Sequence, residues 1–107
     1  IRKKTSEVVS LKTPGKPLGI SQSTGYTEKT VEFESGDLLF LFTDGLVEAL
    51  GGEFLDIEAG FKNLGNIILD CINDTPELVL NRVRNAVRDS SQNDDLADDL
   101  TVLALSL

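Results

Sequence analysis

Residues 38–45 read Leu38-Leu39-Phe40-Leu41-Phe42-Thr43-Asp44-Gly45. A strand with one wet face alternates apolar and polar side chains, whereas a continuous apolar run is typical of a strand covered on both faces. The run therefore predicts a central strand of a sheet over residues 38–42. Asp44 follows almost at once, which places a carboxylate at the end of a buried strand.

A second acidic residue stands in a similar position near the end of the chain. Asp98 comes shortly before residues 101–107, a mostly apolar run that predicts a closing strand. Mg²⁺ and Mn²⁺ prefer oxygen ligands, and a bound ion offsets the cost of desolvating the acids that hold it. Asp44 and Asp98 are therefore the candidate ligands of one divalent cation.

Two further strands are expected upstream, over residues 5–11 and 26–33. A short turn at 35–37 separates the second of these from the run at 38–42, which predicts a hairpin. The prolines and glycines of residues 13–20 exclude a helix and predict a turn, followed by a polar loop.

Helical periodicity begins after Asp44. The apolar residues that share one face of a predicted helix are Leu64, Ile67, Ile68, Cys71 and Ile72, after a short helical turn that contains Leu46, Val47 and Leu50. A second helix begins with Thr75 as N-cap and Pro76 in the first turn, and residues 89–97 form a polar loop. Strands, then two helices, then a strand predict an α+β fold.

Composition limits the function. The 107 residues fit one domain, and the net charge of −8 argues against nucleic acid as a partner. No apolar run is long enough to span a membrane and no signal-peptide core follows the first residues, so a cytoplasmic location is expected. The chain has no histidine, and Cys71 is expected to be a core thiol.

Three stretches together resemble a known family. They are Gly15-Lys16-Pro17-Leu18-Gly19-Ile20, then Gly36 through Ala49 with its Thr43-Asp44-Gly45 step, then Asp98-Asp99-Leu100-Thr101-Val102-Leu103. Their order and spacing resemble the C-terminal half of the SpoIIE-like branch of the type 2C (PPM) metal-dependent protein phosphatases. The resemblance covers nearly the whole chain.

The resemblance implies roles for individual residues. Asp44 and Asp98 would ligate a catalytic Mn²⁺ or Mg²⁺, one of two ions in the complete domain, and Asp99 would support them from a second layer. Gly45 would let the backbone turn sharply beside the ion. Glu48 matches a position that is usually acidic in this branch, and its relation to the metals is left open.

The resemblance also implies an architecture. Residues 1–107 would be the C-terminal portion of one phosphatase domain, half of a four-layer α-β-β-α sandwich with mainly antiparallel strands and two helices on one face. Open sheet edges and exposed strand faces would then favour self-association.

The implied activity is hydrolysis of phosphoserine or phosphothreonine by a metal-bridging water, with a phosphorylated anti-sigma-factor antagonist as the typical protein substrate in bacterial stress or sporulation signalling. The family's first metal motif, an Asp-x-x-Gly-His-Gly-type loop, is absent from these residues. The chain alone is therefore expected to be inactive.

Other interpretations stay open. The domain would lack catalysis if it served as a regulatory or interaction module with a phosphatase-like fold, or as an acidic structural domain for a basic partner. Asp94 and Asp95 are read as loop acids, and the Asp-x-Asp-x-Asp-Gly spacing of a calcium-binding EF-hand is absent.

Overall fold

The structure is a computed structural model that describes residues 1–22, 25–52, 56–90 and 99–107. Within this part the chain forms two strands and three helices, which confirms the α+β class. In chain order they are β1 (Leu38–Phe42), α1 (Asp44–Leu50), α2 (Ile57–Asp70), α3 (Pro76–Ser90) and β2 (Val102–Ser106).

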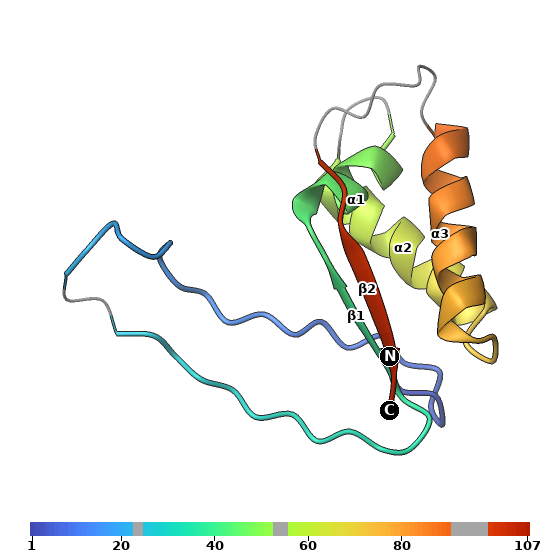
Figure 1. Ribbon diagram of the computed structural model, residues 1–107, viewed down its shortest axis with the longest axis horizontal. Helices are drawn as coiled ribbons and strands as arrows, with labels where there is room; N and C mark the ends of the chain where they lie inside the picture. Colours follow the sequence, from blue (N-terminus) through green and yellow to red (C-terminus); the bar gives the residue numbers. More distant parts are fainter. Residues whose placement is uncertain (23–24, 53–55, 91–98) are drawn as a thin grey trace.

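The sheet joins segments that are far apart in sequence. β1 and β2 are antiparallel, with Leu38 opposite Ser106 and Phe42 opposite Val102. The two ends of the chain consequently lie close together at one end of the sheet (Figure 1). The predicted hairpin is wrong, because β1 pairs with the closing strand and not with residues 26–33.

All three helices lie on one side of this sheet (Figure 1). Every second strand residue, including Phe40 and Ala104, packs against them, as expected for a side-chain period of two. The buried hydrophobic residues of the core are Leu38, Leu46, Val47, Leu50, Leu64, Ile68, Cys71, Val79, Val83 and Val87. The third helix is α1, which the sequence predicted only as a short helical turn.

The opposite face of the sheet is open in the part of the chain that the structure describes. Leu41 is 49% exposed and its cross-strand partner Leu103 is 50% exposed. The expectation of a strand covered on both faces is therefore wrong for this structure. β1 has one covered face and one apolar face that no described element packs on.

The strands expected over residues 5–11 and 26–33 are also wrong. The first of these segments has one isolated bridge, between Arg2 and Glu7, and the second has no ladder. A strand requires a hydrogen-bonding neighbour, and in the described residues neither segment has a backbone hydrogen bond to β1. Strand-like composition is not sufficient without a partner.

The helix ends follow local sequence signals. Asp56 caps α2, because its Oδ1 accepts hydrogen bonds from the N–H groups of Glu58 (3.0 Å) and Ala59 (3.2 Å). Thr75 caps α3 as predicted, with its hydroxyl accepting from the N–H of Leu78 at 3.4 Å. Cys71 is buried and its thiol donates to the carbonyl of Ile67, which confirms the predicted core thiol.

Residues 13–22 and 25–32 form an arm that extends away from the helices and the sheet (Figure 1). Lys29 Nζ donates to the carbonyl of Lys12 at 3.0 Å, where the two limbs of the arm begin. Leu18 is 85% exposed and Ile20 is 69% exposed. No helix in the described ranges is long and apolar enough to cross a membrane.

Candidate functional site

The predicted metal ligand Asp44 is the first residue of α1, directly after β1. Thr43 has the extended backbone of an N-cap residue, with φ −84° and ψ 161°. The Asp44 carboxylate is exposed, and its Oδ1 accepts from the N–H of Gly45 at 3.1 Å. A negative charge in the first turn is favoured by the positive end of the helix dipole.

Thr43 connects this junction to the segment that enters β2. Its N–H donates to the carbonyl of Thr101 at 3.1 Å, which extends the ladder by one pair. Its hydroxyl accepts from the N–H of Thr101 at 3.0 Å and donates to the carbonyl of Asp99 at 3.2 Å. One side chain therefore holds the end of β1 against residues 99–101.

Asp98 lies outside the described residues, as do Asp94 and Asp95. The metal site shared by Asp44 and Asp98 therefore stays a prediction. Asp99 is described and exposed, and it is its backbone carbonyl that meets Thr43.

Gly45 does not make the sharp turn that was expected of it. Positive φ angles occur at Gly19, Gly36 and Gly52 among the described glycines, whereas Gly45 is a buried residue within α1. Its contribution is a backbone N–H that donates to the carboxylate of Asp44. The strand-to-helix change is made at Thr43.

Glu48 lies one helical turn after Asp44. Residues four apart share one side of a helix, so the two carboxylates belong to the same face of α1. Glu48 is half-buried, whereas Asp44 is exposed. The pair makes one side of α1 acidic at the end of the sheet.

A close backbone contact sets the position of α1. A Cβ added to Gly60 of α2 would lie 1.8 Å from the carbonyl oxygen of Val47, so α1 crosses α2 where α2 has no side chain. The side chains of Leu46 and Val47 are buried beside this crossing. Asp44 and Glu48 thus belong to a helix whose position is set by its close contact with Gly60.

The donors at this junction are carboxylate and carbonyl oxygens, which suit Mg²⁺ or Mn²⁺ and not a soft metal. Within the described ranges, however, no group of three acidic or cysteine side chains comes together. The donor chemistry fits a hard cation, but the described residues do not complete a coordination shell of about six oxygens.

The most buried acid of the described residues is Asp37, which sequence reasoning assigned only to a turn. Its two oxygens accept from the N–H groups of Glu34 (2.9 Å) and Lys3 (3.1 Å), and Arg2 lies 3.7 Å away. These backbone donors, that of Glu34 above all, lower the pKa of the Asp37 carboxyl, with Arg2 adding to the effect. It fixes the N-terminal residues to the start of β1.

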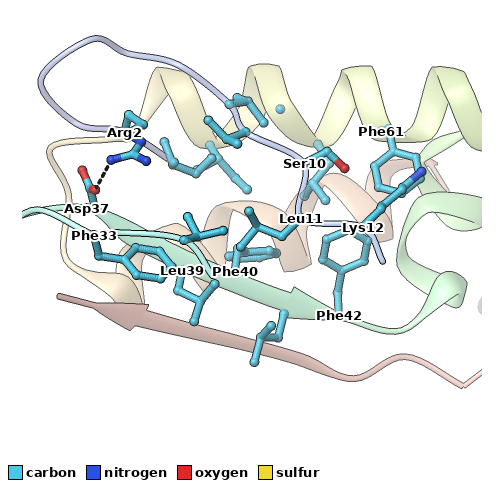
Figure 2. A pocket seen from close by; sticks show the side chains of 18 residues that line it. Arg2, Ser10, Leu11, Lys12, Phe33, Asp37, Leu39, Phe40, Phe42 and Phe61 are labelled. Carbon is cyan, nitrogen blue, oxygen red and sulfur yellow. Dashed lines mark ion pairs between the residues drawn. The ribbon is translucent and has the colours of Figure 1, made fainter. Parts of the chain in front are cut away.

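A cavity of about 330 Å³ lies between β1, α2 and residues 8–12, away from the junction at Thr43. Its walls are mostly apolar, and the Arg2–Asp37 ion pair lies at one end (Figure 2). At the other end Lys12 Nζ sits 4.4 Å from the ring centroid of Phe61. Sequence reasoning did not identify this cavity, because it is formed by segments that have no shared motif.

Comparison with models of protein families shows to which family the chain belongs. Residues 1–107 match the family model described as Stage II sporulation protein E (SpoIIE). The chain belongs to the SpoIIE family. This membership confirms the resemblance stated from the three motif stretches and implies a fold of the type 2C phosphatase kind. Comparison with curated proteins and with solved structures gave no match.

SpoIIE-family phosphatase domains are typically metal-dependent, which agrees with the oxygen donors at the β1–α1 junction.

Thr43 is a residue of this junction to which the sequence analysis assigned no role. Its signal was present, since it precedes Asp44 in the Thr-Asp-Gly step, but its bonds to Asp99 and Thr101 depend on the fold.

Proposed function

We propose that this SpoIIE-family chain is the C-terminal portion of a metal-dependent phosphoprotein phosphatase domain that acts on phosphoserine or phosphothreonine. The complete domain would be a four-layer α-β-β-α sandwich, to which residues 1–107 contribute one helical layer and strands beside it. The open apolar face of β1 and β2 supports this arrangement, since such a face is normally covered by a second layer.

The observation that carries the proposal is the set of hydrogen bonds made by Thr43. Asp44 is its next residue in the chain, and Asp98 is the residue before its partner Asp99. Consecutive Cα atoms are about 3.8 Å apart, so both acids are attached to one hydrogen-bonded point of the structure. This adjacency in sequence supports the proposal that the two carboxylates share one ion.

In this proposal Asp44 and Asp98 contribute carboxylate oxygens to the cation, and Glu48 extends the acidic face of α1. Asp99 contributes to the site through its backbone bond to Thr43. A divalent cation held there would supply Lewis acidity for the attack of water on a phosphoryl group. The residues of this chain hold the two acidic segments together, and a further set of donors comes from outside residues 1–107.

The substrate class follows from the proposed chemistry, and its identity from the family's usual setting. We propose a phosphorylated protein, with an anti-sigma-factor antagonist of a bacterial signalling pathway as the first candidate. The net charge of −8 makes a nucleic acid an unsuitable partner.

The test uses the complete gene product that contains these residues. Phosphatase activity is measured with a phosphoserine peptide and Mn²⁺, for the wild type and for Asp44→Asn and Asp98→Asn. We expect each variant to lose at least about a hundredfold in kcat/KM, because a charged ligand of the ion is replaced by a neutral amide. Asp70→Asn, at an exposed position at the end of α2, is the matched control and keeps wild-type activity.

Calorimetric titration of the same proteins with Mn²⁺ separates binding from turnover. The Asp44→Asn, Asp98→Asn double variant is expected to bind Mn²⁺ more weakly than the wild type. Equal affinity in both proteins would contradict the proposed metal site, whatever the activity measurements show.

A second candidate is a regulatory or protein-interaction domain that keeps the fold without catalysis. It is favoured by the absence of a histidine and of the Asp-x-x-Gly-His-Gly-type loop from residues 1–107. The residues that precede Ile1 in the complete gene product distinguish the two: a phosphatase requires that loop there, whereas a non-catalytic domain lacks it.

A further inference from the structure

Among the described residues, one edge of β1 has no neighbouring strand. The N–H of Thr43 donates to the carbonyl of Thr101, and the N–H of Leu107 donates to the carbonyl of Asp37. The odd-numbered residues of β1 therefore direct their backbone groups toward β2. The N–H and C=O groups of the even-numbered residues point the other way. Among these, Leu38 is paired, whereas Phe40 and Phe42 have no backbone partner on that side within the described ranges.

The partner of Leu38 is Ile1. The N-terminal nitrogen of Ile1 donates to the carbonyl of Leu38 at 2.8 Å, and the N–H of Leu38 donates to the carbonyl of Ile1 at 3.0 Å. This exchange of both bonds is the geometry of an antiparallel strand pair. Ile1 also packs against the hydrophobic core, as a side chain opposite Leu38 should.

The same short segment is paired on its other side. Arg2 and Glu7 exchange two backbone hydrogen bonds, of 2.8 Å and 3.2 Å. Ile1 and Arg2 therefore lie between β1 and the chain that follows Glu7, in the position of a strand between two neighbours. On the N-terminal side of Ile1, the cavity occupies the same position between β1 and the residues that follow Glu7.

The cavity has the boundaries that such a strand requires. One wall is β1 from Leu39 to Phe42, the opposite wall is formed by residues 8–12, and Phe61 and Leu64 of α2 lie on the helical side. Figure 2 shows Leu11, Phe40, Phe42 and Phe61 around the space. Its volume of about 330 Å³ is enough for a few apolar side chains.

We propose that this cavity is a binding slot for one extended polypeptide strand, antiparallel to β1, whose C-terminal end meets Ile1. In an antiparallel pair, a step of two residues along one strand is a step of two in reverse along the other. With Ile1 opposite Leu38, the second residue before Ile1 lies opposite Phe40 and the fourth lies opposite Phe42. These two residues point toward α2 and should be Val, Ile or Leu.

A strand fits the slot better than a lipid or another small apolar molecule. The side chains around the slot are mostly apolar, but the edge of β1 presents the N–H and C=O groups of Phe40 and Phe42, which have no backbone partner among the residues that the structure describes. Only a ligand with backbone amides at strand spacing satisfies these groups and fills the apolar space at once. The inference does not depend on phosphatase activity.

The test extends the full 107-residue chain by five residues placed directly before Ile1. In one protein the second and fourth of them, counted back from Ile1, are Val within a Thr background. In the control protein these two positions are Pro, which has no N–H to donate to the carbonyl groups of Phe40 and Phe42 and so prevents the strand pairing. Amide hydrogen exchange at Phe40 and Phe42 and the Tm are measured for both and for the unextended chain.

We expect the Val extension to slow exchange at Phe40 and Phe42 by at least about tenfold and to raise the Tm, because their amides gain buried partners. The Pro control should leave both readings at the values of the unextended chain. No slowing with the Val extension, or equal slowing with Pro, overturns the proposal. The proposal is also overturned if amide exchange at Phe40 and Phe42 in the unextended chain becomes slower as the protein concentration rises, because a second copy then fills the slot.

Discussion

Among single residues, Thr43 has the largest share in assembling the candidate site. Its backbone extends the β1–β2 ladder, and its hydroxyl joins the carbonyl of Asp99 to the N–H of Thr101. It therefore connects the two acidic segments through one side chain of three heavy atoms.

Replacing this hydroxyl tests its role. Thr43→Val keeps the shape and the strand propensity but removes both side-chain hydrogen bonds, which are exposed and therefore worth about 1 kcal/mol together. We expect urea denaturation to show a loss of this size. Thr101→Val is the matched control, because Thr101 takes part through its backbone, and a change within about 0.5 kcal/mol is expected. Equal losses in the two variants would contradict the assignment.

Asp37 predicts a pH dependence of stability. Its pKa is lowered in the folded protein, so its stabilising effect is complete above the unfolded value of about 3.9 and is lost as pH falls through the folded pKa. Asp37→Asn should therefore lower the Tm at pH 7, and the difference from wild type should shrink as the pH falls below about 4. Asp70→Asn is the exposed control. A Tm difference that is the same at pH 7 and pH 2.5 would contradict this explanation.

At the scale of the elements, the crossing of α1 and α2 decides where Asp44 and Glu48 lie. α2 contains two buried glycines, and they have different surroundings. Gly60 meets the backbone of Val47, whereas a Cβ on Gly65 would lie 3.6 Å from a methyl group of Val8, an ordinary contact distance.

The two glycines form a matched pair for mutation. Gly60→Ala forces α1 and α2 apart and should destabilise the protein by about 1–3 kcal/mol. Gly65→Ala places its methyl group at an ordinary contact distance from Val8 and gains up to about 1 kcal/mol of helix propensity. Chemical denaturation of both variants measures the difference. Similar stabilities would mean that the α1–α2 contact is not what positions α1.

At the scale of the whole molecule, the dominant feature is an apolar face of the sheet on which no described helix or strand packs. Leu41 and Leu103 are direct cross-strand partners on this face, and Leu105 beside them is 38% exposed. An exposed apolar sheet surface of this kind favours association. The self-association expected from the sequence is therefore assigned to this face.

We expect the isolated chain to form dimers or larger species in a concentration-dependent manner. The Leu41→Thr, Leu103→Thr double variant keeps good strand formers but removes apolar surface, so it should shift the chain toward monomer. Leu18→Thr, on the exposed arm, removes a similar side chain elsewhere and should have little effect. Size-exclusion chromatography with light scattering distinguishes these outcomes, and a monomeric wild type at high concentration would contradict the prediction.

Local signals predicted local structure well. The capping role of Thr75 is read from residues within one helical turn, and its hydroxyl accepts from the N–H of Leu78 as predicted. For the candidate site, the position of Asp44 at the end of a strand was predictable. The bonds that join Thr43 to residues 99–101 were not, since nothing in either segment specifies its distant partner.

The amino-acid sequence by itself determined the two long helices, their caps and the strand character of residues 38–42 and 102–106, because these depend on neighbours a few positions apart. Only the tertiary structure decided that β1 pairs with β2, that no described element covers one face of the sheet, and that a cavity lies beside Ile1. The physical reason is that an apolar strand accepts any neighbour with free backbone groups, so its pairing depends on which segments the whole fold brings to its edge.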